Sequence, residues 1–189
     1  MIRQLIAGLV LASLAATAHA AFNIDQLMAG LAQHKGGRAK FVEKRYLAVL
    51  DRPLVATGEM TYTPPDRLET RTLTPKPETL VLDHDQVSIE RDQRKFSINL
   101  AKRPEALAFV DSIRSTLAGN REALEKNYTL QLSGSADSWV LTLSPVAQQI
   151  AALLQRITVS GSRDQIHTID YLLADGDHSE LTIEPLDPR

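Results

Sequence analysis

The histidines and carboxylates of this chain are the side chains that could perform acid–base or metal chemistry. Among the five histidines, no two have the H-E-x-x-H spacing of a helical zinc site. His84 stands between Asp83 and Asp85, a triplet that could hold a metal ion, but these residue types are also typical of a turn between two strands. We therefore interpret the triplet as a turn and expect no metal ion and no cofactor.

Motifs for nucleophilic or phosphate chemistry are missing from the sequence. It contains no G-x-S-x-G, no P-loop and no dinucleotide-binding fingerprint. The Ser-Gly-Ser segments at 133–135 and 160–162 fall where alternating segments have to turn, and Glu122 and Glu125 fall on a polar helix face. We expect no catalytic residue, and a hydrolase with a site assembled in three dimensions is the least favoured alternative.

The first residues of the chain have the pattern of a targeting segment. Arg3 supplies a positive start, residues 5–16 are an apolar run too short to span a bilayer, and an A-x-A cleavage signal ends at Ala20. We therefore expect residues 1–20 to be a signal peptide and the mature chain to begin at Ala21, the alternative being an uncleaved membrane anchor.

Cysteine usage and charge limit the function classes further. The chain has no cysteine, which excludes a lipidated cleavage site, a disulfide framework and a thiolate metal site, and together with the signal peptide predicts a periplasmic protein. Its 21 basic and 23 acidic residues are interspersed, and the net charge is −2. Since no basic stripe is present, we expect no binding to nucleic acid.

The segment LVATGEMTYTPPDRL at 54–68 indicates how the chain is organised. Apolar and polar residues alternate up to Thr63, which is typical of a half-buried strand. Pro64 and Pro65 then end the strand because proline cannot donate to a ladder, and a second strand starts at Arg67. Gly58 in mid-strand is typical of a bend or a close backbone approach. The segment therefore predicts a strand, a corner and a strand in a curved sheet.

Similar alternation predicts further strands along the chain. We expect a long, bulged strand at 39–50 and about eleven strands in all, in an antiparallel arrangement. Two amphipathic helices are predicted at 23–34, where Asn23 caps the start, and at 104–118, where Pro104 begins the helix. The fold class is thus mainly β with helices (α+β), and residues 21–189 are expected to form a single domain.

A curved sheet with one apolar face needs a cover, and the two helices are the candidates. If the sheet closes only in part, a cavity remains beneath them. Each buried methylene contributes about 0.8 kcal/mol, so a chain of about 14 carbons would gain roughly 10 kcal/mol before association costs of several kcal/mol. The pattern therefore predicts a site for acyl chains.

The residues also resemble a known family, the periplasmic lipoprotein-carrier (LolA-like) proteins of Gram-negative bacteria. The resemblance rests on the amphipathic first helix, Ala39-x-Phe41, Pro53-Leu54, Gly58-x-Met60-x-Tyr62, Pro65-Asp66-Arg67-Leu68, Pro75-x-x-Glu78, Asp83-x-Asp85-x-Val87, Trp139-x-Leu141-x-Leu143-x-Pro145 and Asp175-Gly176-Asp177. It implies an unclosed β-barrel with a helical lid, which binds acyl chains on its concave face. It also implies an inner-membrane exporter that loads the carrier and an outer-membrane acceptor that receives the cargo.

One position departs from the family pattern. The family's carriers have an arginine directly before the proline of the corner, and this arginine holds the lid closed; here the position is Pro64. Arg67 lies beyond the corner and is not assumed to replace it. The lid contact is therefore not carried over, and the cargo stays open between a lipoprotein, a glycolipid and another lipid.

The expected ligand-binding residues belong either to the lid or to the concave wall. The lid candidates are Leu27, Leu31, Leu107, Val110 and Leu117. The wall candidates are Phe41, Met60, Tyr62, Leu68, Leu80, Ile89 and Trp139. Ordinary core packing would use the same residue types, so this alternative stays open. The favoured function is a monomeric periplasmic carrier of acyl chains, and the main alternative is a sensor or interaction module that binds a periplasmic protein partner.

Overall fold

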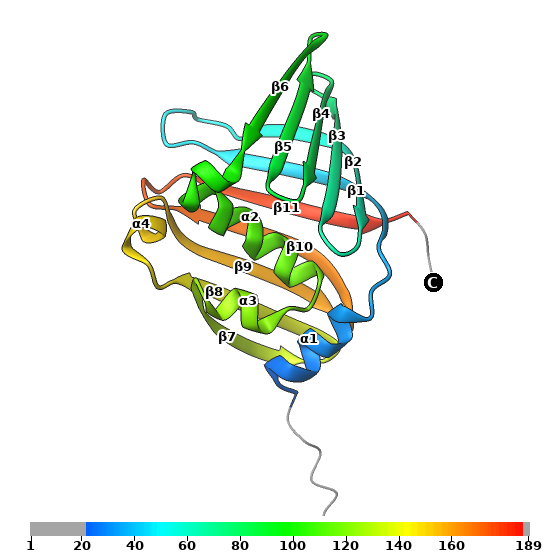
Figure 1. The fold of residues 1–189 in the computed structure, drawn as a ribbon, viewed down its shortest axis with the longest axis vertical. Coiled ribbons are helices and arrows are strands. Elements are labelled where there is room, and N and C mark those ends of the chain that lie inside the picture. The colour runs from blue at the N-terminus through cyan, green and yellow to red at the C-terminus, as the bar shows by residue number, and fades with distance from the viewer. Residues whose placement is uncertain (1–21, 187–189) are drawn as a thin grey trace, which may run out of the picture.

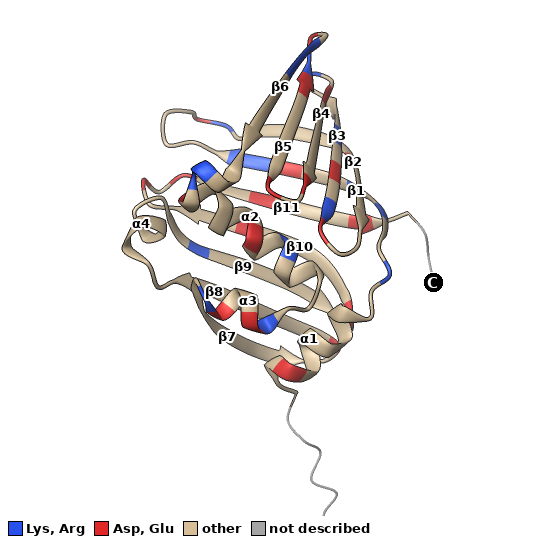
Figure 2. Ribbon diagram, in the orientation of Figure 1, with Lys and Arg blue, Asp and Glu red and all other residues tan. Residues whose placement is uncertain are grey.

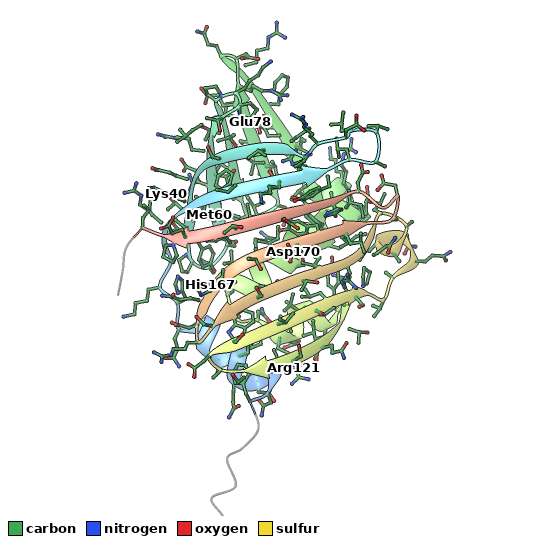
Figure 3. The ribbon with its side chains drawn as sticks, turned by 180° about the vertical axis from the view of Figure 1, so that it is seen from behind. Lys40, Met60, Glu78, Arg121, His167 and Asp170 are labelled. Atoms are coloured by element: carbon green, nitrogen blue, oxygen red, sulfur yellow. The ribbon has the colours of Figure 1, made fainter. Side chains whose placement is uncertain are left out.

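A computed structural model of the protein describes residues 22–186. The expected signal peptide at 1–20 lies outside the described residues. One antiparallel sheet curves around a set of helices that lie against its concave face (Figure 1). The opposite, convex face carries polar side chains such as Lys40, His167 and Asp170 (Figure 3).

The chain forms two strand meanders separated by helices. The first part comprises α1 (Ile24–Ala32), β1 (Gly37–Tyr46), β2 (Leu54–Thr63), β3 (Arg67–Thr74), β4 (Glu78–Asp83), β5 (Gln86–Arg91) and β6 (Arg94–Asn99). The connection comprises the 3-10 helix η1 (Leu100–Lys102), α2 (Pro104–Leu117) and α3 (Arg121–Glu125). The last part comprises β7 (Tyr128–Ser135), β8 (Ser138–Pro145), α4 (Gln148–Ala151), β9 (Leu154–Ser162), β10 (Gln165–Leu173) and β11 (His178–Pro185).

The strand order shows why the barrel stays open. Within residues 22–186 the eleven strands form one sheet in the order β6-β5-β4-β3-β2-β1-β11-β10-β9-β8-β7. The first and last strands pair in the middle, whereas β6 and β7, which follow each other along the chain, form the two edges. The helices between β6 and β7 cross the concave face instead of closing the ring. This confirms the predicted fold class, a curved, unclosed antiparallel sheet of about eleven strands with a helical cover.

Local sequence signals start the two predicted covering helices as expected, and a glycine ends the second one. Asn23 accepts a hydrogen bond from the backbone N–H of Gln26, whose side chain accepts one from the backbone N–H of Asn23, so α1 begins with a capping box. Pro104 is the first residue of α2. Gly119 follows α2 with a φ of 62°, and a Cβ there would collide with the backbone of α1. Glycine therefore ends α2 and lets it approach α1 closely.

The corner between β2 and β3 has the predicted form. β2 ends at Thr63, and β3 begins at Arg67 after the two prolines. Gly58 lies at a register shift between β2 and β3, and a Cβ at this position would collide with the carbonyl oxygen of Arg71 and lie 2.8 Å from the Phe41 ring. The mid-strand glycine therefore permits a close approach of two strands and an aromatic ring, as the sequence indicated.

The prediction for β1 was wrong in two respects. The strand ends at Tyr46 rather than at Leu50, because the N–H of Leu50 bonds to the carbonyl of Leu47 in a turn. β1 also pairs with both neighbours without a register shift, and the bulge lies between Thr57 and Gly58 of β2 instead. None of the helices within residues 22–186 is long and apolar enough to cross a membrane.

Two apolar clusters hold the helices to the sheet. The larger one joins α1, the N-terminal half of α2, α3 and α4 to β7, β8, β9 and β10, and its centre includes Leu27, Trp139 and Leu141. The smaller one joins η1 and the start of α2 to β4 and β5 around Leu82 and Leu100. The middle of the concave face, formed by β1, β2 and β11, contributes few residues to either cluster.

Candidate functional site

A cavity of about 870 Å³ lies between the middle of the concave face and the helices. Inward-facing residues of β1, β2, β3, β4, β10 and β11 form its wall, and residues of α1 and α2 form its roof. The volume lies within the range of roughly 300–1,000 Å³ that is typical of small-molecule sites. A hollow therefore exists where the sequence predicted one.

The wall of this cavity is largely apolar. Along β10 and β11, alternate residues point inward, and Ile169, Leu181 and Ile183 form adjacent parts of the wall. From the roof, Phe109 and Ile113 on α2 face the same space. Such a surface attracts hydrocarbon by excluding water, without requiring a charged partner.

Tyr171 on β10 lies at the junction of wall and roof. Its ring packs on that of Phe109, with a centroid distance of 5.0 Å and an interplanar angle of 53°. Burial raises the pKa of the Tyr171 hydroxyl far above its ordinary value, and the negative charge of Glu43 adds to the effect. The hydroxyl therefore stays protonated at any physiological pH and can donate a hydrogen bond.

Polar groups gather at the end of the cavity that contains Arg45. The Arg45 guanidinium donates from Nε and Nη2 to the two carboxylate oxygens of Glu43, both at 2.8 Å. The Ser179 hydroxyl donates to the same carboxylate at 2.9 Å. The hydrogen bonds with Glu43 raise the pKa of Arg45, and the charge of Glu78 adds to this effect, so the guanidinium keeps its charge. An otherwise apolar wall thus ends in an ion pair between Arg45 and Glu43.

Seven of the twelve residues proposed from the sequence line this cavity. They are Leu31 and Leu117 in the roof, and Phe41, Met60, Tyr62, Leu68 and Leu80 in the wall. Leu31 and Phe41 are also nearly fully buried, so each serves as core and as cavity lining. Their contact with a ligand stays a prediction.

The other five residues do not line this cavity, and their contact with a ligand also stays a prediction. Leu27 and Trp139 are buried in the larger cluster, where α1 and α3 press directly on β7 to β9. Ile89, Leu107 and Val110 pack around the smaller cluster, where α2 begins. In both places helix side chains pack directly against side chains of the sheet.

Several lining residues were missed from the sequence. Phe109, Ile113, Ile166, Ile169, Tyr171, Leu181 and Ile183 all face the cavity. The alternation of β10 and β11 placed these strand residues on one face, and this signal could have found them. What the sequence did not show is that β11 pairs with β1, which brings the last strand into the centre of the wall.

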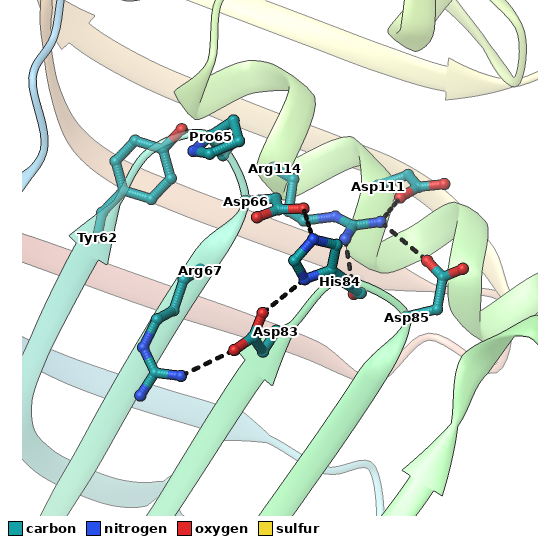
Figure 4. Close-up of polar contacts among 9 residues, drawn as sticks. All are labelled: Tyr62, Pro65, Asp66, Arg67, Asp83, His84, Asp85, Asp111 and Arg114. Atoms are coloured by element: carbon teal, nitrogen blue, oxygen red, sulfur yellow. Dashed lines mark hydrogen bonds and ion pairs between the residues drawn. The ribbon is translucent and has the colours of Figure 1, made fainter.

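The roof is tied to the sheet by Arg114 near the end of α2 (Figure 4). Its guanidinium donates to the backbone carbonyl of His84 at 2.6 Å, lies 3.6 Å from a carboxylate oxygen of Asp85, and bonds to Asp111 on its own helix. The Arg114 side chain is only 13% exposed. An arginine from the helix therefore fastens α2 to the turn between β4 and β5.

Arg67 does not make such a contact. Its guanidinium bonds to Asp83 (Figure 4) and to Glu69, each at 3.1 Å, and both partners belong to the sheet. In this protein the arginine that joins a helix to the sheet is thus Arg114 of α2, whereas the corner position before Pro65 is occupied by Pro64. Tyr62 stiffens the corner itself, because its hydroxyl donates to the carbonyl of Pro65 at 2.9 Å.

His84 lies in the tight turn that the sequence predicted, with a φ of 51°. Its Nδ1 is 2.7 Å from Asp83, and its Nε2 is 3.7 Å from Asp66. The hydrogen bond to Asp83 raises the pKa of His84, assisted by the charge of Asp66, and lowers the pKa of Asp83. The three side chains could converge on a cation, but their pairing and exposure are those of an ordinary surface turn.

Surface charge does not mark a further site. Basic and acidic residues are interspersed over the strands and helices in view, without a stripe of either sign (Figure 2). This agrees with the interspersed charges of the sequence.

Comparison with solved structures finds distant likenesses. A LolA superfamily protein from Nitrosomonas europaea has 8% identity and a TM-score of 0.44, over 88% of this chain and 93% of the other. MucB of Pseudomonas aeruginosa, solved in complex with MucA, has 16% identity and a TM-score of 0.48, over 85% of this chain and 53% of the other. A putative outer membrane lipoprotein-sorting protein domain from Vibrio parahaemolyticus has 11% identity and a TM-score of 0.42, over 85% and 88%. These likenesses carry no functional argument.

A sequence search of curated proteins finds no match. The model of one protein family, described as outer membrane lipoprotein carrier protein LolA-like, matches residues 15–183. The match spans nearly all of the described residues and confirms the resemblance seen in the sequence. The chain therefore belongs to the outer membrane lipoprotein carrier protein LolA-like family.

Proposed function

We propose that this protein is a periplasmic carrier, which encloses the acyl chains of a lipoprotein or another lipid and shuttles them from the inner membrane toward the outer membrane. The observation that supports the proposal is the apolar cavity of about 870 Å³ beneath the helices. A protein without a ligand to hold would gain stability by filling such a space, because cavities in a core are costly.

The energetics favour a chain of methylenes. Each buried methylene contributes about 0.8 kcal/mol, so an acyl chain gains roughly 10 kcal/mol and retains a net gain after association costs of several kcal/mol. The gain comes from solvent exclusion alone, so different acyl chains fit the same wall. Such a site suits a carrier that receives and releases cargo without changing it.

The remaining features of the proposed carrier come from the sequence and the family. The mature protein is a single domain, residues 21–189, which acts as a monomer after removal of its signal peptide. An exporter in the inner membrane supplies the cargo, and an acceptor in the outer membrane receives it. The role is binding rather than catalysis, and it needs neither a metal ion nor a cofactor.

The test compares two tryptophan substitutions at neighbouring positions of β11. Ile183 faces the cavity, whereas Thr182 is exposed on the convex face. Protein purified from the periplasm without detergent should carry acylated molecules detectable by mass spectrometry. Ile183→Trp should remove them by filling the cavity, while Thr182→Trp should keep them. Wild-type protein without any bound or exchangeable lipid would contradict the proposal.

A second candidate, binding of a periplasmic protein partner, is favoured by the edge strand β6. Phe96 and Ile98 on this strand are 51% and 40% exposed, and an exposed edge can pair with a strand of another protein. A stoichiometric complex that forms without lipid and is lost in Phe96→Lys would support this role instead.

A further inference from the structure

One end of the cavity is built to hold a polar group as well as hydrocarbon. The sheet register places Tyr171 of β10 opposite Ser179 of β11, and Ser179 opposite Arg45 of β1. Neighbouring strands are about 4.8 Å apart, so the backbones of Tyr171 and Arg45 are separated by about 10 Å. Ser179 between them donates to the Glu43 carboxylate at 2.9 Å, and Tyr171, Ser179, Glu43 and Arg45 all line this end of the cavity.

The Tyr171 hydroxyl is a donor that lacks a protein partner. Its side chain faces the cavity, and Phe109 holds its ring in place. Among residues 22–186, no atom forms a hydrogen bond with this hydroxyl. Its oxygen is not among the fully buried atoms, so it is accessible from the cavity and available to a ligand atom there. Since burial of the side chain keeps the hydroxyl protonated, it is available as a donor, and its partner would be an acceptor.

Arg45 offers further donors on the same row. A guanidinium has five N–H groups, and Glu43 accepts from Nε and Nη2 only. The N–H groups on Nη1 are therefore left over. The carboxylate of Glu43 is already occupied by Arg45 and Ser179, so the groups that remain available here are donors. A polar atom bound at this end must accept hydrogen bonds.

The charge balance selects a neutral acceptor over an anion. Glu43 neutralises Arg45, and the carboxylate of Glu78, which also lines the cavity, pairs with Arg91 at 3.4 Å. Asp177 adds a negative charge to the same lining. With no net positive charge, this end would repel a carboxylate or a phosphate, whereas an ester or amide carbonyl accepts hydrogen bonds without bringing a charge.

We propose that Tyr171 and Arg45 bind the carbonyl oxygen of the ester or amide that joins an acyl chain to its head group. The protein then selects acylated ligands and discriminates against free fatty acids. This inference rests on the proposed carrier function and identifies its ligand class. The apolar wall supplies the affinity for the chain, and the two donors set where the chain ends.

The test measures how tightly the protein binds three probes with similar chains, by titration calorimetry at pH 8. The probes are glycerol monomyristate, which has an ester, myristic acid, which is ionised, and tetradecane, which has no polar group. The Tyr171→Phe variant removes one hydroxyl and keeps the ring that packs on Phe109. Tyr46→Phe is the matched control, because the Tyr46 hydroxyl bonds to Glu180 on the convex face of the sheet.

Wild-type protein should bind the ester more tightly than the carboxylate. Tyr171→Phe should weaken ester binding about three- to tenfold, which is the effect of one neutral hydrogen bond. The same variant should bind tetradecane as tightly as the wild type does, and this result would also show that the cavity is intact. Tyr46→Phe should bind all three probes as the wild type does. Equal ester binding by Tyr171→Phe and wild type, or tighter binding of myristic acid than of the ester, would overturn the inference and leave the carrier function standing. Failure of the wild type to bind any probe would instead overturn the carrier function.

Discussion

The contact of Arg114 with the β4–β5 turn predicts how firmly the lid is closed. Replacing Arg114 by methionine keeps an apolar stem of similar length and removes every donor. The structure shows one hydrogen bond from this charged group to the His84 carbonyl at 2.6 Å and an ion pair of 3.6 Å with Asp85. The variant therefore leaves α2 attached to the sheet by apolar packing and by the hydrogen bond from the Tyr128 hydroxyl to the Ala108 carbonyl.

The magnitude follows from the burial of the two contacts. A hydrogen bond to a charged group contributes about 1.5–3 kcal/mol, and the Arg114 side chain is only 13% exposed, so we take about 2 kcal/mol for the bond to His84. Asp85 is 54% exposed, and an exposed ion pair adds about 0–1 kcal/mol. A loss of about 2 kcal/mol raises the population of the open lid roughly 30-fold.

Native-state hydrogen exchange measures this opening directly. The amide protons of α2 should exchange about 30-fold faster in Arg114→Met, while those of β8 keep their wild-type rates. Arg121→Met is the control, because Arg121 joins α3 to Asp25 of α1 and has no contact with the β4–β5 turn. It should leave α2 exchange within about threefold of wild type. If α2 exchange in Arg114→Met stays within twofold, the lid is held by packing and the reasoning fails.

Three further predictions follow from burial, backbone space and titration. Leu31→Glu places an unpaired charge at a cavity position that is 2% exposed, and should reduce ligand retention more than tenfold. Gln33→Glu, at the exposed end of α1, should retain the ligand as the wild type does. Equal retention by the two variants would contradict this prediction. Gly58→Ala should lower the free energy of unfolding, measured by urea titration, by about 1–3 kcal/mol. Gly30→Ala is the control, because a Cβ there meets only an ordinary contact at 3.9 Å, and it should raise the free energy of unfolding by about 0.5–1 kcal/mol. An unchanged free energy of unfolding in Gly58→Ala would refute the close approach. The imidazole of His84 should titrate in NMR with a midpoint above 6.5, since its pKa is raised in the folded protein. Its contact with Asp83 therefore stabilises the fold fully below pH 6.5, and this stabilisation is lost as the pH rises through the raised pKa. A midpoint that is not raised would contradict this prediction.

Signals confined to a few neighbouring residues were predicted well. The cap at Asn23, the helix start at Pro104 and the corner after Thr63 all appear as expected. Each depends on hydrogen bonds or steric limits within about four residues, so the local sequence contains all the information needed. The end of β1 was missed because the apolar residues 47–50 continue the run without a breaker, although they form a turn.

The cavity lining was predicted only in part, and the reason is the shared chemistry of core and cavity. Trp139 and Tyr171 are both aromatic residues on the concave face of alternating strands, yet Trp139 is buried in the larger cluster and Tyr171 faces the cavity. Alternation says which face a residue occupies, but not whether a helix side chain meets it there. The choice depends on where α2 crosses the sheet.

By itself, the amino-acid sequence determined the strands, their inward faces, the two covering helices and the family to which they belong, because periodicity and turn residues act over short distances. Only the tertiary structure decided that β11 pairs with β1, and that the helices fill the face over β7 to β9 while leaving the middle hollow. It also brought Arg45 into one row with Tyr171 and Ser179, which lie on the last two strands of the chain. Such contacts depend on the relative placement of segments over a hundred residues apart, and no local pattern encodes that placement.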